Sequence, residues 1–177
     1  LTMLLRMLLH LEAAAYNIPL SAVNVSLKIN VPDGGEDGRI EWEGGPDSTD
    51  FIPQRLVLFQ CKATDMNPSD CKKEVCKRNS NELKPRVEEV LDRGGSYILF
   101  YNKDCNTELQ VSRINAIRTA LKDAGKDYYN SADIKIYDAN KIASWTNKYI
   151  PAIIAVHDWT GRALPIGFQT WRMWEGY

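Results

Sequence analysis

The segment from Leu56 to Ala63 is the most hydrophobic stretch of this 177-residue chain, and it predicts a strand near the centre of a β-sheet. Two polar residues, Gln60 and Lys62, interrupt the end of this segment. Because side chains alternate along a strand, we expect Gln60 and Lys62 on the same face. A carboxylate on a neighbouring strand or turn could then contact both of them.

The spacing of apolar residues predicts the other elements. Helical spacing over residues 3–16 predicts a first helix, and strict alternation over 23–31 predicts a first strand. A helix over about 69–92 is expected to begin at Ser69 or Asp70, with a break at Pro85 as an alternative. The remaining expectations are strands over 39–43, 96–102 and 134–137, helices over 107–124 and 139–148, and a strand or helix start over 152–156.

This order places hairpin strands first and crossover units afterwards, which predicts a mixed-sheet α/β (α+β) fold. The length of 177 residues is enough for one domain with its own core, and no internal domain boundary is visible. The apolar start of the chain, residues 1–11, is too short to span a bilayer and predicts an amphipathic helix rather than a membrane anchor.

Charge and cysteine usage narrow the function classes. A formal net charge of −1 argues against a wholly basic, histone-like protein but leaves room for a local basic groove. Basic residues of the middle helix leave two interpretations open, a solvated surface or a surface that follows nucleic-acid phosphates. They include Lys72, Lys73, Lys77 and Arg78. The four cysteines, Cys61, Cys71, Cys76 and Cys105, match no zinc-ligand spacing and predict free thiols, as in a cytoplasmic protein.

The polar residues around this strand are those that phosphodiester hydrolysis needs. Mg²⁺ or Mn²⁺ binds carboxylate and carbonyl oxygens, neutralises phosphate charge and activates water, and a nearby lysine stabilises developing negative charge. An acidic, glycine-rich turn over residues 34–41 supplies Asp37 and Glu41, and the first helix supplies Glu12. One aspartate, a strand glutamine, a lysine two positions later and a helix glutamate together satisfy these requirements.

With these residues the chain resembles the PD-(D/E)xK nuclease superfamily, whose fold is restriction-endonuclease-like, and in particular its Mrr-like branch with a Gln-x-Lys motif. The resemblance rests on Glu12, the turn over 34–41 and the run Phe59-Gln60-Cys61-Lys62. It implies an αβββαβ core over about residues 3–102 and an extension over about 103–177. It also implies double-stranded DNA as the partner.

The resemblance further implies a role for each residue. Asp37 is expected to be the metal carboxylate, and Gln60 a weaker oxygen ligand assisted by the Cys61 carbonyl. Lys62 is expected to be the catalytic lysine, and Glu12 to hold metal-bound water. The register of related motifs places Glu41, rather than Asp37, at the metal position, so both carboxylates stay open.

The expected function is a metal-dependent DNA endonuclease, the effector domain of a bacterial anti-phage or restriction protein. The resemblance implies an N-terminal position in a longer, cytoplasmic protein that also carries an NTPase or sensor module and forms homo-oligomers. The 177 residues contain no Gly-x-x-x-x-Gly-Lys-Ser/Thr loop, so any NTPase module is expected elsewhere. Two alternatives remain: a catalytically silent nuclease fold that binds DNA or protein, and a junction resolvase or repair nuclease.

Overall fold

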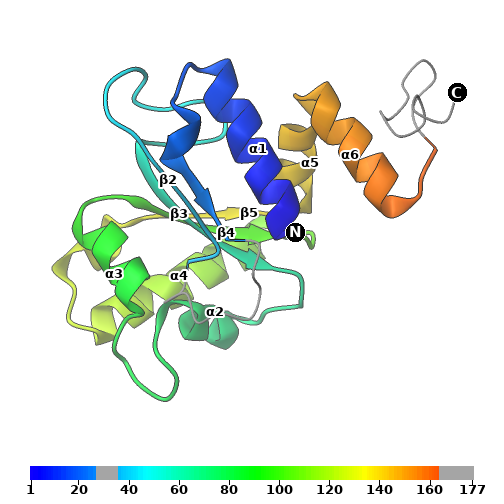
Figure 1. Cartoon of the computed structure of the whole chain (residues 1–177). Helices are drawn as coiled ribbons and strands as arrows, with labels where there is room; N and C mark the ends of the chain where they lie inside the picture. Colours follow the sequence, from blue (N-terminus) through cyan, green and yellow to red (C-terminus); the bar gives the residue numbers. More distant parts are fainter. Residues whose placement is uncertain (27–35, 164–177) are drawn as a thin grey trace, which may run out of the picture.

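The computed structural model describes residues 1–26 and 36–163, and its centre is a five-stranded mixed sheet in the order β1-β2-β3-β4-β5 (Figure 1). The first three strands are antiparallel, whereas β3, β4 and β5 run parallel. The strands are β1 (Val23–Val25), β2 (Gly38–Glu41), β3 (Leu56–Lys62), β4 (Ser96–Tyr101) and β5 (Asp133–Tyr137). The predicted mixed-sheet fold is confirmed, although two helices, over 68–75 and 85–92, connect β3 to β4 where the αβββαβ order expects one.

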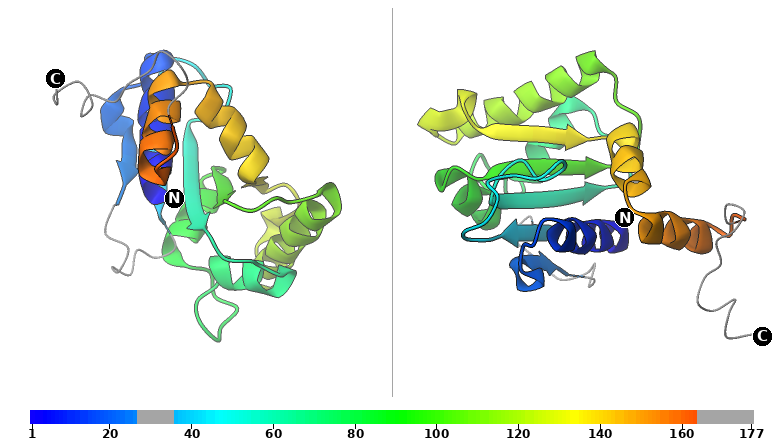
Figure 2. Two further views of the ribbon diagram at one scale, coloured as in Figure 1. Left: turned by 90° about the vertical axis from the view of Figure 1, so that its right-hand side faces the viewer. Right: turned by 90° about the horizontal axis from the view of Figure 1, so that it is seen from above.

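Helices cover both faces of this sheet (Figure 2). Buried side chains of α2, α3 and α4 pack on one face, and those of α1, α5 and α6 pack on the other. The helices are α1 (Thr2–Ala15), α2 (Pro68–Val75), α3 (Pro85–Asp92), α4 (Thr107–Asp123), α5 (Ala139–Asn147) and α6 (Ile150–Thr160). None of the helices in the described part of the chain is long and apolar enough to cross a membrane.

Strand β3 is the central strand that its composition predicts. Val57 and Phe59 face the layer of α1 and α5, whereas Leu58 faces the layer of α2, α3 and α4. The alternation continues to the end of the strand, so Gln60 and Lys62 share the face of Leu58. In the parallel pairing with β4, Gln60 is level with Leu99 and Lys62 with Tyr101.

The predicted long helix over 69–92 is two helices. After Val75 the chain becomes extended, and an isolated bridge joins Cys76 to Leu83 before α3 begins at Pro85. Proline has no N–H for a helical hydrogen bond and disfavours a helical residue before it, which explains the start of α3 at this position.

The residue that caps α2 also differs from the expectation. The side chain of Asn67 accepts a hydrogen bond from the Asp70 backbone N–H (3.0 Å), and the Asp70 carboxylate accepts one from the Asn67 backbone N–H (3.3 Å). Asn67 is therefore the N-cap, and Asp70 completes a capping box from the third helical position. Pro68 occupies the first turn, where its missing N–H costs nothing.

The remaining boundaries follow the sequence pattern closely. One open alternative is decided, and one strand is shorter than expected. The segment over 152–156 belongs to helix α6, so the helical alternative holds. Only 23–25 of the predicted strand over 23–31 is assigned as strand, and residues 27–35 lie outside the described part of the chain.

The extension packs directly on the core. Trp145 of α5 is fully buried and stacks on Phe51 with ring centroids 5.3 Å apart. Its ring centroid is also 6.5 Å from that of Phe59 on β3 and 6.4 Å from that of Phe100 on β4. One aromatic cluster therefore spans both parts of the chain.

Candidate active site

Asp37 and Gln60 meet where β2 begins and β3 approaches its end. The carboxylate oxygen Oδ2 of Asp37 accepts hydrogen bonds from Gln60 Nε2 (2.7 Å) and from the Cys61 backbone N–H (2.6 Å). The ladder fixes this arrangement, because the Asp37 backbone N–H donates to the Phe59 carbonyl at 3.0 Å. The structure thus brings together Asp37 and Gln60, the two residues that the resemblance pairs.

Gly38 permits the close approach of helix α1 beside this pair. A Cβ atom at position 38 would lie 3.0 Å from Leu5 Cδ2 and 3.1 Å from Val25 Cγ2. A side chain here would require Leu5 and Val25 to shift by a few tenths of an ångström. The glycine therefore has a packing role next to the site.

Two buried polar atoms in this region have no hydrogen-bond partner within the described part of the chain. They are Gln60 Oε1 and the hydroxyl of Tyr97 on β4. Gln60 is 7% exposed and Tyr97 is fully buried. Burial raises the pKa of Tyr97 well above its ordinary value, and the charges of Glu74 and Asp37 raise it further. Buried oxygens without partners are uncommon in folded proteins, and a bound water molecule or ion would satisfy them.

Lys62 lies on the same face as Gln60, but its ammonium group is held by helix α2. Lys62 Nζ is 2.8 Å from Glu74 Oε2, and the side chain of Glu74 is only 14% exposed. Lys84 Nζ lies 3.9 Å from the same carboxylate oxygen. Glu74 is therefore a part of the site that the sequence analysis did not identify.

A sequence signal for Glu74 exists in retrospect. A helix that connects two parallel strands packs on one face of their sheet. Cys71 and Val75 are the buried residues of α2, and Glu74 adjoins them on the helix surface. An acidic residue beside the buried residues of this crossover helix is thus directed toward the C-terminal end of β3, where Gln60 and Lys62 lie.

Glu41 does not lie with Gln60 and Lys62. It pairs with Leu56 at the opposite end of β3 and binds two arginines, Arg39 (2.6 Å) and Arg93. The hydrogen bond from Arg93, with a further one from Arg39, lowers the pKa of the Glu41 carboxyl. Of the two carboxylates that the sequence left open, the structure places Asp37 next to Gln60.

Glu12 lies on the other side of the sheet, within the layer of α1, α5 and α6. It is fully buried and accepts hydrogen bonds from Tyr149 OH (2.6 Å), Trp145 Nε1 (2.9 Å) and Lys148 Nζ (3.2 Å). Hydrogen bonds from the extension thus surround this carboxylate. Glu12 is not brought to Asp37 and Gln60.

Cys61 contributes its backbone N–H, rather than its carbonyl, to the contact with Asp37. Its thiol is unpaired with another cysteine, as are those of Cys71, Cys76 and Cys105, which confirms the predicted free thiols. Burial, followed by the charge of Asp37, raises the pKa of the Cys61 thiol to about 12. The thiol is therefore protonated and unreactive at neutral pH.

A basic cavity of about 850 Å³ lies between α2 and the connection to α3. The residues that line it are cationic or uncharged: Ser69, Lys72, Lys73, Cys76, Lys77, Arg78, Asn79, Ser80, Asn81 and Lys84. This basic groove contains all four of the predicted DNA-binding residues. Three of its lysines already have acidic partners outside the lining, since Lys72 contacts Asp123, Lys73 contacts Asp70 and Lys77 contacts Glu82. Lys84 connects the groove to Glu74 and so to the end of β3.

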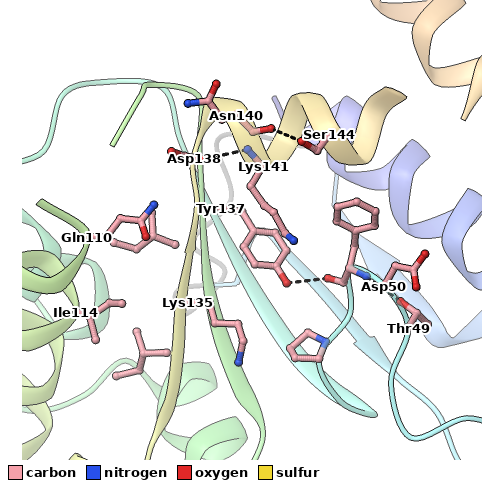
Figure 3. Close-up of a pocket in the computed structure, with 14 residues that line it drawn as sticks. Thr49, Asp50, Gln110, Ile114, Lys135, Tyr137, Asp138, Asn140, Lys141 and Ser144 are labelled. Carbon is pink, nitrogen blue, oxygen red and sulfur yellow. Dashed lines mark hydrogen bonds between the residues drawn. The ribbon is translucent and has the colours of Figure 1, made fainter. Parts of the chain in front are cut away.

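Another cavity, of about 650 Å³, lies along β5 and the start of α5 (Figure 3). Its walls are held by the Tyr137 hydroxyl, which donates to the Phe51 carbonyl (2.9 Å), and by the Lys141 backbone N–H, which donates to Asp138 (3.0 Å). Neither Asp37 nor Gln60 lines this cavity. The chemistry considered above therefore belongs to the end of β3 and not to this cavity.

The oxygen donors around Asp37 suit a hard cation, although they are few. In the described part of the chain, no group of three or more His, Cys, Asp or Glu side chains is arranged to hold a metal ion. What the site offers is the Asp37 carboxylate, the unpartnered amide oxygen of Gln60 and the nearby Glu74 carboxylate. Such oxygens are the ligands that Mg²⁺ and Mn²⁺ prefer, and Mg²⁺ keeps several waters in protein sites.

Comparisons with known proteins give one partial similarity. No protein-family model matches the chain, and no solved structure matches it. A protein named adenylate kinase from Rickettsia bellii (strain RML369-C) is 29% identical over 116 residues, which are 60% of this chain and 54% of the relative. The chain therefore spans about half the length of this curated relative.

Proposed function

We propose that this chain is a metal-dependent endonuclease that hydrolyses phosphodiester bonds in double-stranded DNA. The observation that carries the proposal is the pairing of Asp37 with Gln60 on the face that also carries Lys62. The buried Gln60 Oε1, which has no partner in the described part of the chain, supports a ligand at this place. It is an oxygen donor in a position where a cation would satisfy it.

Mg²⁺ or Mn²⁺ would be held by the Asp37 carboxylate and the Gln60 amide oxygen. When bound, such an ion neutralises phosphate charge and makes a water molecule more acidic. The amide of Gln60 presents nitrogen to Asp37 in the structure, so a cation shared by the two residues would replace this hydrogen bond and bind the amide oxygen. The Cys61 backbone N–H keeps the Asp37 carboxylate oriented.

Lys62 supplies positive charge on the same face. Successive side chains on one face of a strand are about 6.6 Å apart, so the Lys62 ammonium can reach a phosphate located beside Gln60. There it stabilises negative charge that develops on the phosphate oxygens. To do so Lys62 must leave Glu74, which binds it in the structure.

The basic groove supports the choice of substrate. Its five cationic side chains belong to Lys72, Lys73, Lys77, Arg78 and Lys84, and no acidic side chain lines it. Because Lys84 and Lys62 both lie near Glu74, the groove adjoins the candidate active site. A DNA backbone in the groove would therefore pass close to the end of β3, and such binding should weaken strongly as the salt concentration rises.

The test is cleavage of supercoiled plasmid by the 177-residue chain in Mg²⁺ or Mn²⁺, compared with the same reaction in chelator. We expect cleavage only with the metal, and we expect Asp37→Asn and Lys62→Ala to reduce it at least a hundredfold. Matched controls are Asp47→Asn, whose side chain is 93% exposed, and Lys135→Ala, on the face of the sheet opposite Lys62. Full activity of the two site variants would refute the proposal.

A catalytically silent fold that binds DNA is the second candidate. It is favoured by the ion pair that occupies Lys62 and by the small number of acidic ligands within residues 1–26 and 36–163. Titration calorimetry with Mn²⁺ separates the two functions, because a silent domain should bind DNA through the basic groove without binding the metal.

Phosphoryl transfer between nucleotides is not part of the proposal. The similarity to the protein named adenylate kinase is partial, and the 177 residues here contain no glycine-rich P-loop for nucleotide phosphates. A role as the effector of a defence protein, with attached modules and homo-oligomers, stays a prediction from the family resemblance.

A further inference from the structure

Glu74 carries a largely buried carboxylate beside the proposed site. It projects from α2 toward the end of β3, contacts Lys62 at 2.8 Å and is 14% exposed. Its position adjoins the buried residues Cys71 and Val75, so helix packing directs it inward. An exposed glutamate often pairs with a surface lysine and has no further role. Glu74 differs because it is largely buried and its partner Lys62 belongs to the proposed active site.

The space near Glu74 contains polar atoms that lack partners. Gln60 Oε1 and the Tyr97 hydroxyl are buried, and neither has a hydrogen-bond partner in the described part of the chain. The charges of Glu74 and Asp37 both raise the pKa of Tyr97, and the printed contact of Glu74 is with Lys62 at 2.8 Å. Gln60, only 7% exposed, bonds to Asp37 and shares a face of β3 with Lys62, the partner of Glu74.

We infer that Glu74 is the second carboxylate ligand of the divalent cation proposed at Asp37 and Gln60, and that Lys62 occupies this carboxylate until the cation binds. The inference rests on the proposed function for the identity of the cation. It assigns two states to Glu74: paired with Lys62 without metal, and bound to the metal with Lys62 released toward the phosphate.

The charges of the site agree with this exchange. Asp37 and Glu74 carry two negative charges, and Lys62 carries one positive charge that reduces the charge of the metal-free site. A glutamine at position 60 contributes an oxygen without charge, so Asp37 alone would leave the metal poorly neutralised. Glu74 provides the missing negative charge. Binding of the cation in place of Lys62 then frees the lysine at the moment when it is needed.

The experiment measures Mn²⁺ affinity by titration calorimetry without DNA. We expect Glu74→Gln to weaken Mn²⁺ binding at least tenfold and Glu74→Asp to restore part of it. Glu82→Gln is the matched control, because Glu82 follows α2, is 70% exposed and also pairs with a lysine, Lys77. The Mn²⁺ affinity of the Glu82→Gln protein should equal that of the unmodified chain. Equal affinities for Glu74→Gln and the unmodified chain would overturn the inference.

A second variant tests the exchange without removing the ligand. Lys62→Met removes the nearer of the two lysines beside Glu74, at 2.8 Å against 3.9 Å for Lys84, so Mn²⁺ binding should become tighter. The gain should shrink in the Glu74→Gln background, since the carboxylate for which Lys62 competes is then absent. A gain of the same size in both backgrounds would show only a general effect of charge and would overturn the inference. Circular dichroism of each variant confirms folding.

Cleavage of plasmid in parallel separates this inference from the proposed function. If the unmodified chain binds Mn²⁺ through Glu74 but cuts no DNA, the ligand assignment holds and the nuclease proposal fails. If it cuts DNA and Glu74→Gln has normal Mn²⁺ affinity, the nuclease proposal holds and the assignment fails. If it neither binds the metal nor cuts DNA, both are overturned.

Discussion

At the residue scale, the identity of Gln60 decides the charge of the proposed metal site. The amide shares one hydrogen bond with Asp37 at 2.7 Å and leaves its oxygen buried without a partner in the described part of the chain. A carboxylate at position 60 would meet Asp37 as a like charge at the same separation. Without a cation such a pair is unfavourable, whereas with a cation both oxygens become ligands.

We therefore predict opposite effects of Gln60→Glu with and without metal. In chelator the variant should melt at a lower temperature than the unmodified chain, because two carboxylates repel each other. With Mn²⁺ it should regain that stability and bind the ion about tenfold more tightly, equivalent to about 1.4 kcal/mol. Thermal unfolding and calorimetry measure the two effects. Gln110→Glu, on helix α4, is the control and should show neither. A variant insensitive to Mn²⁺ would contradict the metal site.

Sequence reasoning at this scale found the residues that the backbone ladder positions and missed those that depend on packing. Gln60 and Lys62 follow from strand alternation, and Asp37 from its turn next to that strand. Glu74 and Glu12 receive their partners through contacts between helices and strands distant in sequence. No local pattern specifies which partner a helix glutamate will meet. The resemblance assigns Glu12 to the metal site, whereas in the structure it contacts Trp145, Lys148 and Tyr149, and Glu74 was not considered.

At the element scale, helix α2 is short, and its cap matters because it carries Glu74. It has eight residues, Pro68–Val75, and begins with the capping box of Asn67 and Asp70. An isolated helix of this length is not stable in water, so its position depends on its cap and on the burial of Cys71 and Val75.

Asn67→Ala should therefore destabilise the protein by about 1 kcal/mol, since the Asp70 backbone N–H loses its acceptor. Urea unfolding measures the loss as a lower midpoint at an unchanged slope. Asn67→Asp keeps an acceptor and adds a negative charge at the helix N-terminus, so it should be close to neutral. If Asn67→Asp is as unstable as Asn67→Ala, the capping box does not stabilise α2.

The elements themselves were largely predictable, because β3 and β4 are short continuous apolar runs and the apolar residues of α4 recur at helical spacing. The break between α2 and α3 was not decided by the sequence. Proline at position 85 permits either a kink or a helix start, and the structure resolves the choice through the bridge of Cys76 with Leu83. Similarly, the apolar segment of α6 is compatible with strand or helix until its neighbours are known.

At the scale of the whole molecule, buried and half-buried tyrosines link stability to alkaline pH. Burial raises the pKa of Tyr137 to about 12, and burial is also the main cause that raises the pKa values of Tyr97, Tyr101, Tyr128 and Tyr149. An unfolded tyrosine has a pKa of about 10. A raised pKa in the folded state means that the unfolded chain ionises first. The stability is therefore intact below about pH 10 and is lost as pH rises above it.

We predict that these phenols ionise together with unfolding rather than independently. The near-ultraviolet absorbance of tyrosinate and the circular dichroism should change in one shared transition at alkaline pH. A sample in concentrated guanidinium is the control and should titrate near the unperturbed pKa of about 10. Full ionisation near that pH with the structure retained would show that the phenols are not buried.

Glu12 holds the extension to the core. It accepts hydrogen bonds from Trp145, Lys148 and Tyr149, and Lys148 contacts Asp50 as well (2.9 Å). The carboxylate is fully buried, so its removal leaves donors inside the protein without an acceptor. The family resemblance divides the single expected domain into a core up to about residue 102 and an extension, and these contacts with the aromatic cluster at Trp145 join the two parts in one packed unit.

We predict that Glu12→Ala destabilises the whole chain by about 3 kcal/mol, the lower end of the cost of breaking a buried pair, because Lys148 keeps Asp50. Guanidinium unfolding should show a single transition at a lower midpoint, since the core and the extension unfold together. Glu12→Gln should lose less stability, because the glutamine amide oxygen can still accept a hydrogen bond from Trp145 or Tyr149. Glu43→Ala, at an exposed position, is the control and should change little.

Mn²⁺ affinity in the same variants decides whether Glu12 also belongs to the metal site. Its three donors lie on the face of the sheet opposite Gln60 and Lys62, so Glu12→Gln should bind Mn²⁺ as the unmodified chain does. Asp37→Asn should lose binding without a comparable loss of stability. If Glu12→Gln instead weakened Mn²⁺ binding while unfolding normally, the carboxylate would act on metal-bound water, as the family resemblance implies, and the structural role argued above would be wrong.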